Sequence, residues 1–98
     1  MKTVDEIKQE RDAELQGMEE RYRARQEEVA KEKEAAKAEV EEKYSKGENA
    51  DKDVDRYKDL QRQEDKNFDN YVDERKQVWD DHQEEIDKTE KENDEYEK

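Results

Sequence analysis

Three aspartates at alternate positions, Asp51, Asp53 and Asp55, are the side chains of this chain most suggestive of metal binding. A calcium-binding loop begins with acids spaced in this way. The sixth position of such a loop requires glycine and the twelfth a glutamate that ligates the ion, but these positions hold Arg56 and Arg62. We therefore interpret the aspartates as acids that favour the positive N-terminal end of a helix.

The chain has one histidine, His82, which could act as an acid or base. It has no cysteine and one serine, Ser45, which could act as a nucleophile. In di-iron helical bundles a glutamate stands three residues before each ligating histidine, but that position here is Trp79. We expect His82 to lie between two helices, opposite Leu15. The sequence predicts no catalytic, cofactor-binding or metal site, and the protein is not expected to be an enzyme.

Charge dominates the chain: 56% of its 98 residues are charged, and the net charge is −13. Such a protein repels nucleic acids and anionic membranes, so we expect a protein partner with a basic surface. The charge is uneven. Residues 1–20 contain seven acids and three bases, and residues 80–98 contain ten acids and three bases, whereas residues 21–37 contain six bases and four acids.

The elements that would carry these charges are helices, since the chain has no proline and is rich in Glu, Lys, Gln, Arg and Ala. Thr3 and Glu6 match a capping box, and Gly47 can adopt the left-handed conformation that ends a helix. We predict an all-α, single-domain, coiled-coil-like helical hairpin over residues 1–98. Its helices would span about residues 4–46 and 51–96, with a turn at about residues 47–50.

An eleven-residue period runs through both predicted helices and suggests how they pair. Folding the chain back at Glu48 and Asn49 would place three residues of the first helix opposite three of the second. A period of eleven implies nearly straight helices or slight right-handed coiling. The expected helix–helix seam pairs Val40 with Tyr57, Val29 with Phe68, and Met18 with Trp79.

The hairpin would also bring the two most acidic segments side by side, giving roughly one net negative charge per 2.7 Å, against one per about 1.7 Å in duplex DNA. We hypothesise that this acidic pole docks on a basic, nucleic-acid-binding surface of a protein partner and masks or inhibits it, as a DNA mimic. Solubility alone would also explain an excess of acids. The acidic pole comprises Asp5, Glu6, Glu10, Asp12, Glu14, Asp80, Asp81, Glu84, Glu85 and Asp87.

The alternative function is structural: a coiled-coil scaffold, spacer or assembly subunit that acts through its helix–helix seam. With only 27% hydrophobic residues, two helices bury too little apolar surface, so we expect a homo-oligomer that completes the core. No signal peptide or membrane span is apparent, which predicts an intracellular, cytoplasmic protein. A virion-associated protein would have the same features.

Overall fold

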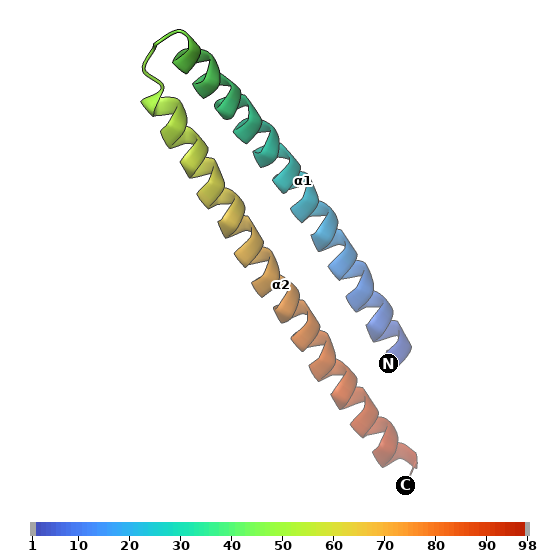
Figure 1. Ribbon diagram of the computed structural model, residues 1–98. Coiled ribbons are helices and arrows are strands. Elements are labelled where there is room, and N and C mark those ends of the chain that lie inside the picture. Colours follow the sequence, from blue (N-terminus) through green and yellow to red (C-terminus); the bar gives the residue numbers. More distant parts are fainter. Residues whose placement is uncertain (1, 98) are drawn as a thin grey trace. The chain divides into compact units, whose positions relative to one another are not determined.

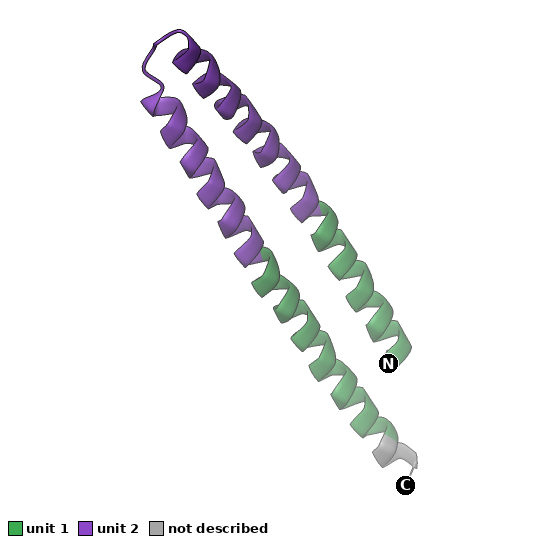
Figure 2. Cartoon of the chain, in the orientation of Figure 1, with its two compact units in different colours: residues 1–20, 71–98 green, residues 21–70 purple. Residues whose placement is uncertain are grey.

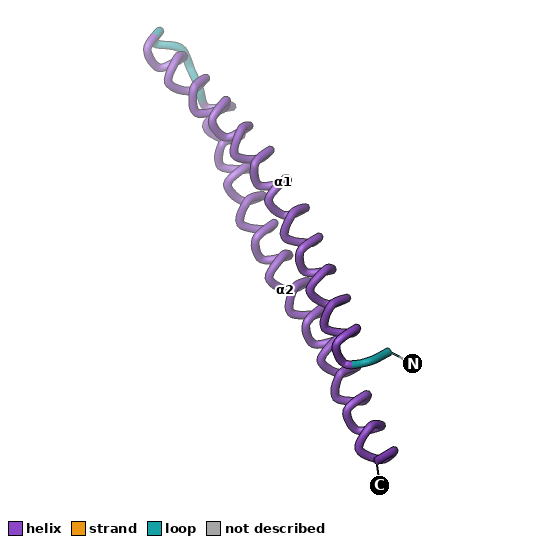
Figure 3. Tube along the Cα trace, turned by 90° about the vertical axis from the view of Figure 1, so that its right-hand side faces the viewer, coloured by secondary structure: helices purple, strands orange, loops and turns teal. Residues whose placement is uncertain are grey.

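The computed structural model describes residues 2–97, and side chains are described for residues 2–93. The chain is all-α: α1 spans Val4–Ser45 and α2 spans Asp51–Glu97. The two helices pack against each other as a hairpin (Figure 1; Figure 3), which confirms the predicted fold class. Residues 1 and 98, which the predicted domain included, lie outside the described residues, and the single domain stays a prediction.

Thr3 caps the N-terminus of α1. Its backbone carbonyl accepts a hydrogen bond from the Ile7 amide at 3.1 Å, and its hydroxyl accepts one from the Glu6 amide at 3.2 Å. The hydroxyl also donates to the Glu6 carboxylate at 3.3 Å. The bond from the Glu6 amide satisfies a donor that the helix leaves without a partner in its first turn, and the bond from Ile7 is the first bond of the helix itself. Together they confirm the predicted cap.

Gly47 ends α1 in the left-handed conformation, with φ of 70°. Its amide donates to the carbonyl of Tyr44 at 3.1 Å, and the next amide, of Glu48, donates to the carbonyl of Lys43 at 2.8 Å. This pair of bonds is a Schellman motif, and it satisfies two of the last carbonyls of the helix.

The start of α2 is fixed by Asn49 and Ala50. The Asn49 side-chain oxygen accepts a hydrogen bond from the Asp51 amide at 2.8 Å, and the Ala50 carbonyl accepts one from the Val54 amide at 2.9 Å. Ala50 is 1% exposed, so the turn folds against the helices and does not project from them. The polar bonds of the turn and this buried methyl group together set where the chain reverses.

A salt bridge joins the two helices next to the turn: the Lys43 Nζ lies 2.6 Å from the Asp53 carboxylate. The hydrogen bond to Asp53 raises the pKa of Lys43 above its ordinary value, and the charges of Asp53, Glu39 and Glu48 add to this effect. Asp53, in the first turn of α2, therefore forms an ion pair with a lysine of α1.

The hairpin divides into two compact units (Figure 2). The terminal unit comprises residues 1–20 and 71–98, and the turn unit comprises residues 21–70. In each, a stretch of α1 packs against a stretch of α2.

The core of the turn unit is a cluster of Val29, Ala36 and Leu60, with Tyr57 packed against it. Polar contacts between the helices surround this cluster. The Lys33 ammonium donates to the Gln61 side chain at 2.6 Å and lies 3.5 Å from the Glu64 carboxylate. Small apolar groups and hydrogen-bonded polar groups therefore share the contact between the helices.

Gln26 extends these polar contacts along the turn unit. Its side-chain amide donates to the backbone carbonyl of Glu64 at 3.2 Å, and its side-chain oxygen accepts from the Asn67 side chain at 3.3 Å. Polar pairs of this kind favour one alignment of two helices, because a shift would leave buried donors and acceptors unpaired.

Among residues 2–20 and 71–93 of the terminal unit, the buried side chains are Ile7, Met18, Ile86 and Thr89, and the two isoleucines are almost fully buried. The Thr89 hydroxyl donates to the carbonyl of Glu85 at 2.9 Å, which satisfies it inside its own helix. This core is small, because most of the other described residues of the unit are charged.

The predicted seam residues differ in how far they are buried. Met18 and Val29 are buried, and Val40 and Tyr57 are partly buried and line one hollow. The two others depart from expectation: Phe68 is 53% exposed and Trp79 is 45% exposed. They lie beside the helix–helix contact and do not fill it.

The reason for this departure is that the shielded positions on both helices recur every seven residues. On α1 these positions include Leu15, Tyr22, Val29, Ala36 and Lys43, all of them buried or partly buried. Seven residues is the spacing of a left-handed coiled coil, so an eleven-residue stripe on α2 drifts off the contact. The partly buried positions of α2 with this spacing are Tyr57, Glu64, Tyr71, Val78 and Glu85.

Candidate interaction surface

The acidic pole lies entirely within the terminal unit. Residues 1–20 hold seven acids and three bases and residues 71–98 hold twelve acids and five bases, a net charge of −11. The turn unit holds fifteen acids and thirteen bases, a net charge of −2. The division between the compact units is therefore also a division between a strongly acidic and a nearly neutral part of the chain.

Nine of the ten residues of the acidic pole are exposed, and the tenth, Glu85, is partly buried. Helical spacing arranges them in rows, since residues three or four apart share a side of a helix. Asp80, Glu84 and Asp87 form one such row on α2, and Glu6, Glu10 and Glu14 form another on α1. Rows of exposed carboxylates on both helices form a surface suited to cations.

Lys2 shows how these carboxylates act on a cation. Its ammonium lies 2.9 Å from the Glu10 carboxylate. The hydrogen bond to Glu10 raises the pKa of Lys2 above its ordinary value, and the negative charges of Glu10, Glu85 and Glu6 raise it further. Because Glu85 belongs to α2 and the others to α1, acids of both helices stabilise one positive charge.

Arg11, a base in the middle of this surface, is turned inward. Its guanidinium carbon lies 4.2 Å from the centroid of the Trp79 ring, a cation–π contact, and its side chain is only 13% exposed. A guanidinium nitrogen also lies 3.1 Å from the Asp12 carboxylate. The Trp79 ring therefore holds Arg11 against the helix surface, and Asp12 of the acidic pole forms an ion pair with it.

His82 has a structural role in the same unit. Its Nδ1 donates to the Val78 carbonyl at 2.7 Å, and its Nε2 lies 3.6 Å from the Glu14 carboxylate. Protonation of the ring would turn this second contact into an ion pair. We expected His82 opposite Leu15, and the contact observed is with the adjacent Glu14.

No group of three or more side chains suited to hold a metal ion occurs among the residues that the structure describes. In that part of the chain, neither helix has an apolar stretch of the length needed to cross a membrane.

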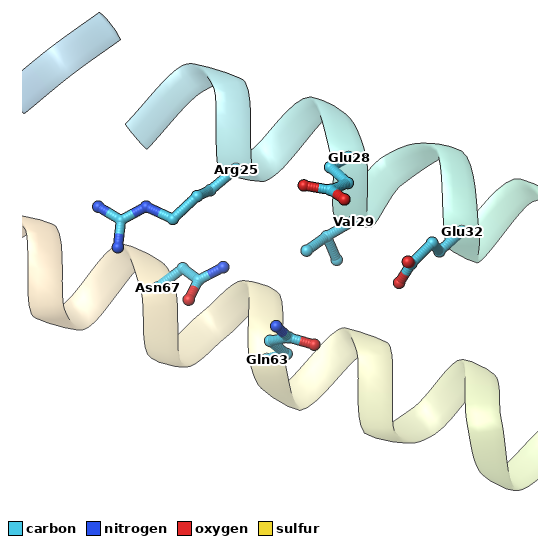
Figure 4. A pocket seen from close by; sticks show the side chains of 6 residues that line it. All are labelled: Arg25, Glu28, Val29, Glu32, Gln63 and Asn67. Carbon is cyan, nitrogen blue, oxygen red and sulfur yellow. The ribbon is translucent and has the colours of Figure 1, made fainter. Parts of the chain in front are cut away.

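The turn unit has two unlike flanks, which the sequence reasoning missed. On one flank a hollow of about 190 Å³ is lined by charged and amide side chains around Val29 (Figure 4). The polar lining residues are Arg25, Glu28, Glu32, Gln63 and Asn67.

The other flank of the turn unit carries aromatic and aliphatic side chains. The Tyr22 and Phe68 rings lie 6.5 Å apart, and Val40, Val54 and Tyr57 line a hollow of about 250 Å³. The signal that could have revealed this flank is the eleven-residue spacing of Tyr57 and Phe68, which was assigned to the seam.

Comparison with known proteins gives no relative: no family model, curated protein or solved structure matches this chain.

Proposed function

We propose that this chain is a non-enzymatic interaction protein whose terminal unit docks on a basic surface of a nucleic-acid-binding protein and masks it. The observation that carries the proposal is the charge difference between the units, −11 against −2. Acids that served solubility alone would have no reason to concentrate in one compact unit. A surface that must compete with a polyanion needs this concentration.

The regular arrangement of carboxylates on the terminal unit supports a defined docking surface. Its carboxylates are carried by helices and are held in rows at fixed spacing, and Trp79 holds Arg11 against the helix surface. Fixed charges reduce the ordering that binding requires, which favours affinity and speeds association with an oppositely charged surface.

The second candidate function is a coiled-coil scaffold or spacer. The polar pairs between the helices, such as Lys33 with Gln61 and Gln26 with Asn67, favour it because they define one alignment of the hairpin. A scaffold would act through this alignment, and its exposed acids would be replaceable.

Two variants that lose the same number and types of charge separate these functions. The pole variant carries Asp80→Asn, Asp81→Asn, Glu84→Gln, Glu85→Gln and Asp87→Asn. The control variant carries Glu41→Gln, Glu48→Gln, Asp55→Asn, Asp65→Asn and Asp69→Asn, all exposed and all in the turn unit.

Each protein is immobilised and used to capture proteins from a cell lysate at low and at high salt. We expect the wild type and the control variant to retain basic proteins at low salt and to release them at high salt. The pole variant should retain at least about tenfold less, equivalent to about 1.4 kcal/mol. Equal losses in both variants, or none in either, would contradict the proposal, as would a wild type that captures no basic protein.

A further inference from the structure

We infer that the aromatic flank of the turn unit is the surface on which a second copy of this chain docks. The aromatic flank is defined by Tyr22, Ala30, Val40, Val54, Tyr57 and Phe68. It lies wholly within residues 21–70, and this inference does not depend on the role of the terminal unit.

The flank contains three adjoining hollows, which we call the groove. Val40, Val54 and Tyr57 line one hollow, and Tyr57 also lines a second hollow with Ala30. Ala30 in turn lines a third, larger hollow with Tyr22, of about 400 Å³. Neighbouring hollows thus share residues, and the ring pair of Tyr22 and Phe68 lies at one end of the groove.

The centre of the groove suits close approach by another helix. Ala30 is exposed and presents only a methyl group, between the larger side chains at either end. Of the aromatic residues around it, Phe68 is 53% exposed, and Tyr22 and Tyr57 are partly buried. Aromatic residues are enriched in the cores of protein interfaces.

The contrast between the polar and the aromatic flank of the turn unit indicates which of them a second copy would cover. By helical periodicity, residues 25, 28 and 32 lie on one side of the buried Val29, and residues 26, 30 and 33 lie on the other. The first side is lined by charged and amide groups, as Figure 4 shows, and water can solvate it. The aromatic flank exposes apolar surface that association would remove from water.

The charges beside the groove identify the occupant as a second copy. Three bases and three acids line its hollows: Arg23, Lys33, Lys37, Glu27, Glu34 and Glu64. Because two identical chains pair through the same surface in a two-fold dimer, that surface must tolerate its own charges. This flank is balanced, so two copies that meet there bring no net charge into the contact, although each chain carries −13.

The chain as a whole exposes more surface than a compact protein of its mass. The chain exposes 7835 Å², whereas a globular monomer of 12.0 kDa exposes about 6,000 Å². A stable interface removes about 800 Å² from each partner. The surplus exceeds that requirement.

Analytical ultracentrifugation of the full chain tests the inference with Ala30→Glu and a matched control, Ala24→Glu. Both alanines are exposed on α1 in the turn unit, but Ala24 lines none of the hollows of the aromatic flank. Since both positions are exposed, circular dichroism should show unchanged helicity in each variant.

The wild type and Ala24→Glu should sediment with twice the 12.0 kDa mass of the chain, and Ala30→Glu should lose the dimer and sediment as a monomer. The inference is overturned if the wild type is monomeric at every concentration. It is equally overturned if Ala30→Glu remains dimeric, or if Ala24→Glu abolishes the dimer as well.

Discussion

Individual residues at the ends of the helices determine where this chain changes direction. Gly47 has φ of 70°, which L residues with a side chain rarely adopt, and the space that a Cβ atom would enter is open to 4 Å. A side chain there would therefore be opposed by the backbone conformation and not by neighbouring atoms. The other glycine, Gly17, lies inside α1 without a positive φ, where the same absence of a side chain weakens the helix.

The two glycines should respond in opposite directions to one substitution. Gly47→Ala should lower the free energy of unfolding by about 1 kcal/mol, because alanine is strained in the left-handed conformation. Gly17→Ala should raise it by about 0.5–1 kcal/mol, because alanine loses less conformational freedom in a helix. Urea unfolding followed by circular dichroism measures both. A Gly47→Ala protein as stable as the wild type would show that the turn does not depend on this conformation.

At the level of the helices, contact between α1 and α2 depends on few apolar side chains. Leu60 is buried in the cluster with Val29 and Ala36, whereas Phe68, a larger residue two turns further along α2, is 53% exposed. We therefore expect the smaller residue, Leu60, to stabilise the hairpin more than Phe68 does.

Truncation should rank these two residues by burial and not by size. Leu60→Ala should cost about 3 kcal/mol, since it removes buried groups and leaves a cavity. Phe68→Ala should cost less, because half of its ring is already in water. Both are measured by urea unfolding at a protein concentration low enough to dissociate oligomers. A larger loss for Phe68→Ala would instead support the eleven-residue seam on α2.

The sequence predicted the two helices and their ends because local bonds determine them: the Thr3 cap, Gly47 and the Asn49 side chain act within a few residues. The sequence predicted less well which face of α2 packs against α1. Apolar residues are too sparse on α2 to define one period, and the contact includes polar residues such as Glu64 and Gln61. Such pairs depend on both helices at once and cannot be read from the spacing in one.

At the scale of the whole chain, charge is the property that distinguishes its parts. The acidic segments 1–20 and 80–98 were expected to meet because an antiparallel hairpin brings its ends together, and both belong to the terminal unit. The boundary of that unit depends on packing, and no sequence pattern marked it. The eleven-residue spacing of Tyr57 and Phe68 did mark the aromatic flank, but it predicted a buried seam there. We propose that one unit serves binding to a basic partner and that the other serves pairing of two copies.

Competition with DNA tests the central proposal most directly. A basic protein captured by the immobilised chain is challenged with a DNA duplex of about 20 base pairs at constant salt. If the acidic pole occupies the nucleic-acid-binding surface, the duplex should displace the partner in proportion to its concentration. The pole variant should be displaced at lower duplex concentrations than the control variant. A stable complex that holds the partner, the duplex and this protein together would contradict the proposal.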